Sequence, residues 1–157
     1  MEVVVLVGLQ GSGKSTFYRS KFASTHTLVS KDRFPNNRRP ARRQAQLIEE
    51  ALSEGRSVVV DNTNPTVEDR AAIVSIARAF GARLTAYYFS APIQDCLVRN
   101  RQRTGKSLVP DAAIFITQKR LQPPTLAEGF AQIWQVNVDL DLNGAVTVEV
   151  RAEPGAS

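Results

Sequence analysis

The stretch Gly8–Thr16, with the sequence GLQGSGKST, combines glycines with a lysine and several hydroxyl side chains. It follows the apolar run Val3–Val7, so the pattern predicts a strand, a glycine-rich turn and then a helix. Glycines let the backbone curl with its amides inward, Lys14 supplies a compact charge, and Ser15 offers a hydroxyl to Mg²⁺. The pattern predicts a phosphate-binding loop for a nucleoside triphosphate, with these contacts: Gly8, Gly11, Ser12, Gly13, Lys14, Ser15 and Thr16.

Acidic side chains follow the next two apolar runs. Asp32 comes shortly after Thr27–Val29, and Asp61 closes Val58–Val60. Ligands of parallel α/β sheets bind beyond the carboxyl ends of the strands, so both carboxylates are expected beside the triphosphate. For Asp61 we predict a role at the metal, together with Ser15, and an Asx turn is the alternative. For Asp32 we predict orientation of an acceptor hydroxyl, and a surface ion pair is the alternative.

Basic residues dominate the charge balance, with a net charge of +5 and a three-to-one excess of arginine over lysine. Guanidinium groups bind phosphate in a two-pronged geometry, which favours a polyanionic partner over a merely solvated helix face. A second group, including Arg99, Arg103 and Lys106, adjoins Gly105 and predicts a lid over the phosphates, or else a basic helix end. The larger group of arginines, a cluster at 33–43, falls within eleven residues that contain no acidic side chain: Arg33, Arg38, Arg39, Arg42 and Arg43.

The segments that must position these residues alternate between apolar runs and helical patterns. Strands are predicted over 3–7, 27–29, 57–60, 84–89, 133–138 and 146–150, and helices over 15–23, 40–53, 67–80, 92–103 and 110–121. This order predicts the α/β class: a single P-loop kinase domain whose parallel sheet is flanked by helices on both faces, with a helical lid. We assign residues 1–150 to this domain and 151–157 to a flexible tail, with a tight turn at Asn143–Gly144.

Several classes of protein are disfavoured by what the chain contains. Cys96 is the only cysteine and His26 the only histidine, so neither a disulfide framework nor a structural metal site is expected. No apolar stretch approaches the roughly 20 residues that a membrane-spanning helix needs. We therefore expect a cytoplasmic protein with no membrane partner.

Five motifs occur together in the chain: GLQGSGKST, SKDR, VVVDNTNPT, RNRQR and PPTLAEGF. From Val3 to about Val138 the sequence resembles the kinase domain of the polynucleotide 5′-kinase/3′-phosphatase family. In that family the domain transfers the γ-phosphate of ATP to 5′-hydroxyl ends of DNA or RNA with Mg²⁺. The resemblance implies ATP and Mg²⁺ as cofactors and nucleic acid 5′-hydroxyl ends as partners. The sequence departs from the animal proteins of the family in lacking their phosphatase and forkhead-associated domains, so we expect a kinase domain that stands alone.

The resemblance also assigns roles to individual positions. Three residues are expected to act in catalysis: Lys14, Asp32 and Arg103. The triphosphate would further contact Arg99, and the acceptor strand would lie along Asp32, Thr63 and Arg70. From the arginine cluster at 33–43 we add Arg33 and Arg38 to the expected acceptor contacts. One departure stands out, because Pro35 occupies the position where the phage-type enzyme has an arginine. The contact to the acceptor phosphate is therefore expected to differ.

Two other functions remain open at this point. A small-molecule kinase acting on a sugar acid, nucleoside or similar alcohol would need the same loop and lid, but not the whole arginine cluster at 33–43. A non-catalytic module gated by ATP would need the loop and not Asp32.

Overall fold

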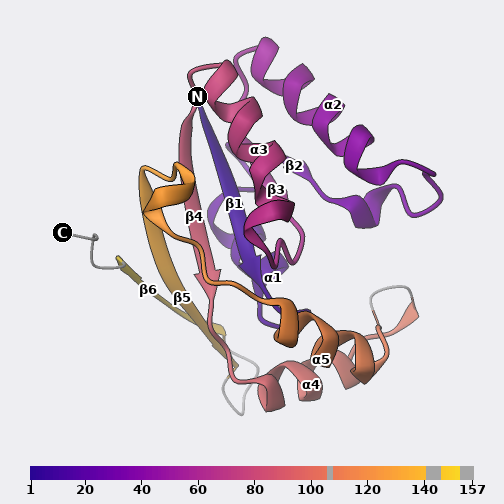
Figure 1. The fold of residues 1–157 in the computed structure, drawn as a ribbon. Coiled ribbons are helices and arrows are strands. Elements are labelled where there is room, and N and C mark those ends of the chain that lie inside the picture. The colour runs from indigo at the N-terminus through magenta and orange to yellow at the C-terminus, as the bar shows by residue number, and fades with distance from the viewer. Residues whose placement is uncertain (106–107, 141–145, 153–157) are drawn as a thin grey trace.

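A six-stranded sheet in the order β2-β3-β1-β4-β5-β6 forms the centre of the computed structural model, which describes residues 1–105, 108–140 and 146–152 (Figure 1). The first five strands are parallel and β6 is antiparallel to β5, which confirms the predicted parallel sheet and adds an antiparallel edge. The strands are β1 (Glu2–Gly8), β2 (Thr27–Val29), β3 (Val58–Asp61), β4 (Arg83–Phe89), β5 (Gln132–Leu140) and β6 (Val146–Ala152).

Helices cover both faces of this sheet because alternate side chains of a strand point to opposite sides. Val3 and Val5 of β1 pack with α2 (Pro40–Ser53) and α3 (Val67–Ala79), while Leu6 packs with Phe17 of α1 (Lys14–Lys21). The continuous apolar runs of the sequence are thus strands buried on both sides. The remaining helices are α4 (Ile93–Arg101), α5 (Asp111–Arg120) and the short 3₁₀ turns η1 (Lys31–Arg33) and η3 (Leu126–Glu128).

The carboxyl ends of the strands meet at one edge of the sheet. Leu6 pairs with Asp61, and Gly8 pairs with Phe89, so β1, β3 and β4 all end there. Helices α4 and α5 lie beyond this edge, and their buried side chains form a small cluster with Leu9 of the phosphate loop (Figure 1). Among the described residues, none of the helices is both long and apolar enough to span a bilayer.

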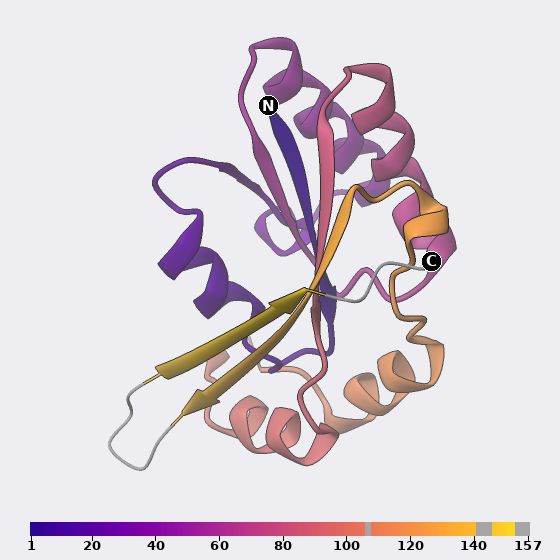
Figure 2. The ribbon, with the colours of Figure 1, turned by 90° about the vertical axis from the view of Figure 1, so that its left-hand side faces the viewer.

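Every predicted strand and helix is present, with ends that differ by at most two residues from the prediction. Two residues assigned to the tail belong to β6 instead, because Arg151 and Ala152 pair with Gln135 and Trp134. The rest of the predicted tail, 153–157, lies outside the described residues. Figure 2 shows the resulting β5–β6 hairpin extending away from the other strands. An antiparallel partner for β5 supplies the hydrogen bonds that the edge strand would otherwise lack. The turn predicted at Asn143–Gly144 lies outside the described residues.

Candidate active site

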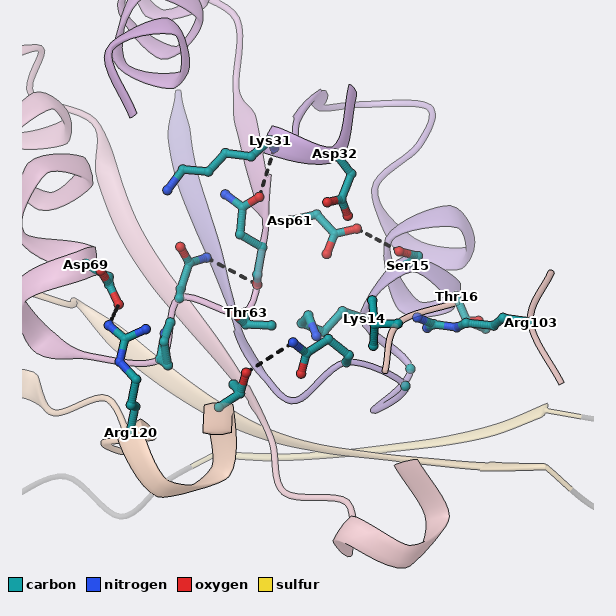
Figure 3. A pocket seen from close by; sticks show the side chains of 18 of the residues that line it. Lys14, Ser15, Thr16, Lys31, Asp32, Asp61, Thr63, Asp69, Arg103 and Arg120 are labelled. Carbon is teal, nitrogen blue, oxygen red and sulfur yellow. Dashed lines mark hydrogen bonds and ion pairs between the residues drawn. The ribbon is translucent and has the colours of Figure 1, made fainter. Parts of the chain in front are cut away.

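A cavity of about 710 Å³ opens at the carboxyl edge of the sheet, a volume typical of small-ligand sites (Figure 3). Its walls come from the phosphate loop, from the ends of β2 and β3, and from the segment after α4. The structure places these residues with predicted roles in the wall: Gly11, Gly13, Lys14, Ser15, Thr16, Asp32, Asp61, Thr63 and Arg103.

The phosphate loop has a backbone that only glycine tolerates at two positions. Gly11 has φ +80° and Gly13 has φ +99°, both in the left-handed region. A Cβ atom on Gly11 would lie 2.5 Å from the carbonyl oxygen of Cys96, and one on Gly13 would lie 2.7 Å from the Cβ of Val138. Gly13 also caps α1, whose first amides face an incoming anion. The loop therefore packs closely against α4 and β5, and its backbone amides remain available to bind phosphate.

Gly13→Ala is expected to abolish nucleotide binding and to destabilise the fold. A left-handed conformation costs alanine about 1–2 kcal/mol, and the collision with Val138 adds about 1–3 kcal/mol of overpacking. Gly81→Ala is the matched control, because Gly81 has φ +66° but open space around its Cβ position. Urea unfolding and calorimetric titration with an ATP analogue check both variants. Equal losses of stability in the two would contradict the collision.

The Lys14 side chain folds back onto the phosphate loop from which it extends. Its Nζ donates hydrogen bonds to the carbonyl oxygens of Gly8 (2.9 Å) and Leu9 (2.7 Å) and lies 3.5 Å from Ser12 Oγ. Burial lowers the pKa of Lys14 to about 8, and the Asp61 carboxylate opposes that shift. Gly8 and Ser12, predicted as direct contacts, do not line the cavity and instead hold the lysine.

Ser15 and Asp61 form a pair of hard oxygen ligands. Ser15 Oγ donates to Asp61 Oδ2 at 2.8 Å, and Asp61 is only 8% exposed. Burial raises the pKa of the Asp61 carboxyl, and nearby Asp32 adds to the rise, against the effects of Lys14 and the Ser15 hydrogen bond. A buried carboxylate beside a second one is stabilised by a cation, and Mg²⁺ prefers oxygen ligands of this kind. The residues present therefore fit the predicted metal.

Asp32 is held at the cavity by hydrogen bonds through Asn62, which follows β3 and connects the turn η1 to α2. Asn62 Oδ1 accepts a hydrogen bond from the Lys31 amide (2.9 Å), and its Nδ2 donates to Gln44 Oε1 (2.6 Å). The Ser30 hydroxyl caps the same turn by accepting from the Asp32 amide (3.3 Å). The turn η1 is thereby fixed to the end of β3, and the Asp32 carboxylate lies beside that of Asp61 (Figure 3).

Two arginines flank the phosphate loop on the side of Thr16. Arg103 lines the cavity near Thr16 (Figure 3). Arg19 lines it as well and donates from Nη2 to Thr16 Oγ1 at 3.4 Å. The sequence interpretation missed Arg19, although its position four residues after Ser15 puts it on the same face of a helix.

Arg99 was predicted to contact the triphosphate, and the structure places it elsewhere. Its guanidinium donates to the carbonyl oxygens of Gly11 (3.2 Å) and Val138, and it does not line the cavity. Arg99 thus ties the underside of the phosphate loop to β5. A helical position in a basic segment does not reveal which way so long a side chain turns.

Arg70 is a second correction, because its side chain is buried in the core and does not line the cavity. It is 0% exposed, and its Nε and Nη2 donate to the carboxylate of Glu128 at 2.8 and 3.0 Å. Its Nη1 donates to the carbonyl oxygen of Asn64 (2.9 Å), while Glu128 also accepts from the Thr125 amide (2.8 Å). Arg70 therefore joins the DNTNP motif to the PTLAEGF motif, through a hydrogen bond to the Asn64 carbonyl oxygen and a buried ion pair with Glu128. Thr63, in contrast, lines the cavity.

The arginine cluster at 33–43 does not line the main cavity. Arg33 and Arg38, which were predicted to contact the acceptor strand, are therefore outside it. Within the described part of the chain, four guanidinium groups of this cluster form neither hydrogen bonds nor ion pairs: those of Arg38, Arg39, Arg42 and Arg43. A shallow cavity of about 300 Å³ is lined by Asn37, Arg38, Arg39, Arg42, Arg43 and Gln46.

A family model described as an AAA domain matches residues 3–124, which is most of the chain. The chain belongs to the AAA domain family. Over 139 residues the chain is 31% identical to the bifunctional polynucleotide phosphatase/kinase of Schizosaccharomyces pombe, which confirms the predicted resemblance. The match covers 86% of the chain and 33% of that relative, so the chain spans about a third of its length.

Solved structures show the same fold. A fungal RNA kinase has a TM-score of 0.68 at 15% identity, covering 91% of this chain and 40% of that one. A gluconokinase from Sinorhizobium meliloti 1021 has a TM-score of 0.62 at 19% identity, covering 86% and 81%. At such identities the likeness concerns the fold alone, and it confirms the predicted α/β architecture, a parallel sheet flanked by helices on both faces.

Proposed function

We propose that this AAA domain is an ATP-dependent kinase that phosphorylates 5′-hydroxyl ends of DNA or RNA. The observation that carries the proposal is that Asp32 shares one cavity with Lys14 and with the Ser15–Asp61 pair. A phosphate-binding loop alone would serve any nucleotide-binding protein. A second carboxylate opposite the loop is what a kinase needs to handle an acceptor alcohol.

Each side chain has a part in the proposed transfer. Lys14, Arg103 and the first amides of α1 hold the phosphates and balance their charge. Ser15 and Asp61 would hold Mg²⁺, which supplies positive charge to the phosphate oxygens. The acceptor oxygen forms a bond to the γ-phosphorus as the bond to the leaving ADP oxygen breaks, and Asp32 orients the hydroxyl and accepts its proton late in the step.

The arginine cluster supports a nucleic acid acceptor. Four guanidinium groups without acidic neighbours repel one another, and a chain of phosphates neutralises several of them at once. They adjoin the segment that carries Asp32, since η1 leads through 34–39 into α2. The Schizosaccharomyces pombe relative, a polynucleotide phosphatase/kinase by name, is consistent with the same class of acceptor.

The test is transfer of label from γ-labelled ATP to DNA and RNA oligonucleotides with free 5′-hydroxyl ends, in Mg²⁺ at low salt. Label at the 5′ end is expected, and oligonucleotides already phosphorylated there serve as the control. Protein that binds ATP but labels neither nucleic acid would exclude the proposal.

A small-molecule kinase is the second candidate, because the predicted acceptor contacts Arg33 and Arg38 lie outside the cavity. The same assay with gluconate, nucleosides and similar alcohols distinguishes the two. Labelling of a small alcohol with no labelling of oligonucleotides would favour this candidate. Inactivity on both sets would favour a module that is merely gated by ATP.

Charge reversal at Arg38 and Arg39 is expected to raise the oligonucleotide KM about tenfold or more, because two charged contacts are lost. The slope of log affinity against log salt should become shallower by about 1.4, at 0.7 per contact on single strands. Filter binding from 50 to 200 mM salt measures it. Arg56→Glu with Arg83→Glu changes the net charge equally at the opposite edge and should leave the slope unaltered; equal effects of both double variants would contradict a local contact.

A further inference from the structure

Two cations lie at the end of the main cavity that is farthest from Thr16. In Figure 3, Thr16 and Arg103 lie at one end, Lys14 in the middle, and Arg120 with Asp69 at the opposite end, toward which the Lys31 side chain also extends. The cations on the Thr16 side belong with the nucleotide. Lys31 and Arg120 therefore lie where the acceptor must enter.

Arg120 is held by a contact that is easily exchanged. Its Nη2 lies 3.3 Å from Asp69 Oδ2, and the two side chains are 56% and 38% exposed. An exposed pair of this kind contributes little to stability, so a stronger anion can displace the aspartate. Within the described residues the Lys31 ammonium makes no hydrogen bond or ion pair, so it too is available. The pair joins the first turn of α3 to the end of α5.

We infer that Arg120, assisted by Lys31, binds the phosphate on the 3′ side of the acceptor nucleoside, and that Asp69 occupies Arg120 until this phosphate displaces it. The inference rests on the proposed function. It identifies residues that could contact the acceptor phosphate, since Pro35 cannot supply a charged side chain for that contact. Arg33, Arg38, Arg39, Arg42 and Arg43 all lie outside the cavity, whereas Lys31 and Arg120 line it with Asp32. Arg120 donates a single hydrogen bond to Asp69 at 3.3 Å, whereas a guanidinium can bind a phosphate through two.

The two members of the pair should have opposite effects on binding. Arg120→Gln is expected to weaken binding of adenosine 3′-monophosphate about 10- to 100-fold, the usual value of a hydrogen bond to a charged group. Asp69→Asn removes the competitor and is expected to tighten the same binding about two- to fivefold, bounded by the small worth of an exposed pair. Adenosine, which lacks the phosphate, should bind both variants as it binds the unaltered protein.

The measurement is calorimetric titration of adenosine 3′-monophosphate and of adenosine into protein saturated with Mg²⁺ and a non-hydrolysable ATP analogue. The matched controls are Arg101→Gln and Asp111→Asn, because Arg101 and Asp111 form an exposed pair of 3.2 Å that does not line the cavity. Both controls should leave the affinities unchanged. A purely structural pair would give losses of the same sign for Arg120→Gln and Asp69→Asn, and that result would overturn the inference.

Failure of the inference is separable from failure of the proposed function. If oligonucleotides accept label but the affinity for adenosine 3′-monophosphate is the same in the Arg120 and Asp69 variants, the phosphate subsite is excluded and the proposed kinase activity stands. If no label is transferred but the affinity for adenosine 3′-monophosphate still depends on Arg120, the anion subsite stands and the proposed polynucleotide kinase activity is excluded.

Discussion

Asp32→Asn is expected to lower kcat for phosphoryl transfer by about 10²–10⁴-fold, the usual contribution of a positioned acid or base. Asparagine has the same shape, so the Asn62 hydrogen bonds and the Ser30 cap that hold the turn should persist. Its amide cannot take the proton of the acceptor hydroxyl. ATP affinity should change little, because the contacts of Lys14 and Ser15 remain.

Single-turnover transfer of label to an oligonucleotide measures this effect, and calorimetry with an ATP analogue measures nucleotide binding. Asp111→Asn is the control for loss of one carboxylate, since Asp111 pairs with Arg101 at the surface, away from the cavity wall. An Asp32→Asn variant with unaltered kcat would mean that Asp32 takes no part in the transfer, and it would contradict the assigned role.

Arg70→Met is expected to reduce the free energy of unfolding by about 3–5 kcal/mol. The substitution leaves Glu128 buried without its positive partner, and Glu128 is only 6% exposed as a side chain. It also deprives the Asn64 carbonyl oxygen of its donor. Urea denaturation measures the loss, and Arg101→Gln, which breaks an exposed pair, should cost no more than about 1 kcal/mol.

The double variant Arg70→Met with Glu128→Leu separates the ion pair from general damage. Replacing both charges with apolar side chains removes the uncompensated carboxylate, so most of the lost stability should return. A contact with the acceptor strand, which the family resemblance implied for Arg70, would instead raise the oligonucleotide KM and leave stability untouched. That result would contradict the core role.

The amino-acid sequence predicted the parts of the site that depend on local structure. Gly11 and Gly13 are required by the backbone itself, and Lys14 and Ser15 follow them directly, so nine residues define the phosphate loop. Asp61 was predictable because it ends a buried strand beside β1, and parallel strands bring their carboxyl ends together. Asp32 follows from the same rule, although its exact place depends on Asn62 and Gln44.

Long side chains were the part that the sequence left undecided. Arg70, Arg99 and Arg120 are all arginines on or beside predicted helices, yet one is buried against Glu128, one supports the underside of the loop, and one reaches Asp69 at the cavity. Residue type and spacing determined where the triphosphate loop and its carboxylates lie, because backbone geometry and strand order place them. Only the tertiary structure decided what each guanidinium contacts, because a flexible chain of several bonds takes its direction from partners that are remote in the sequence.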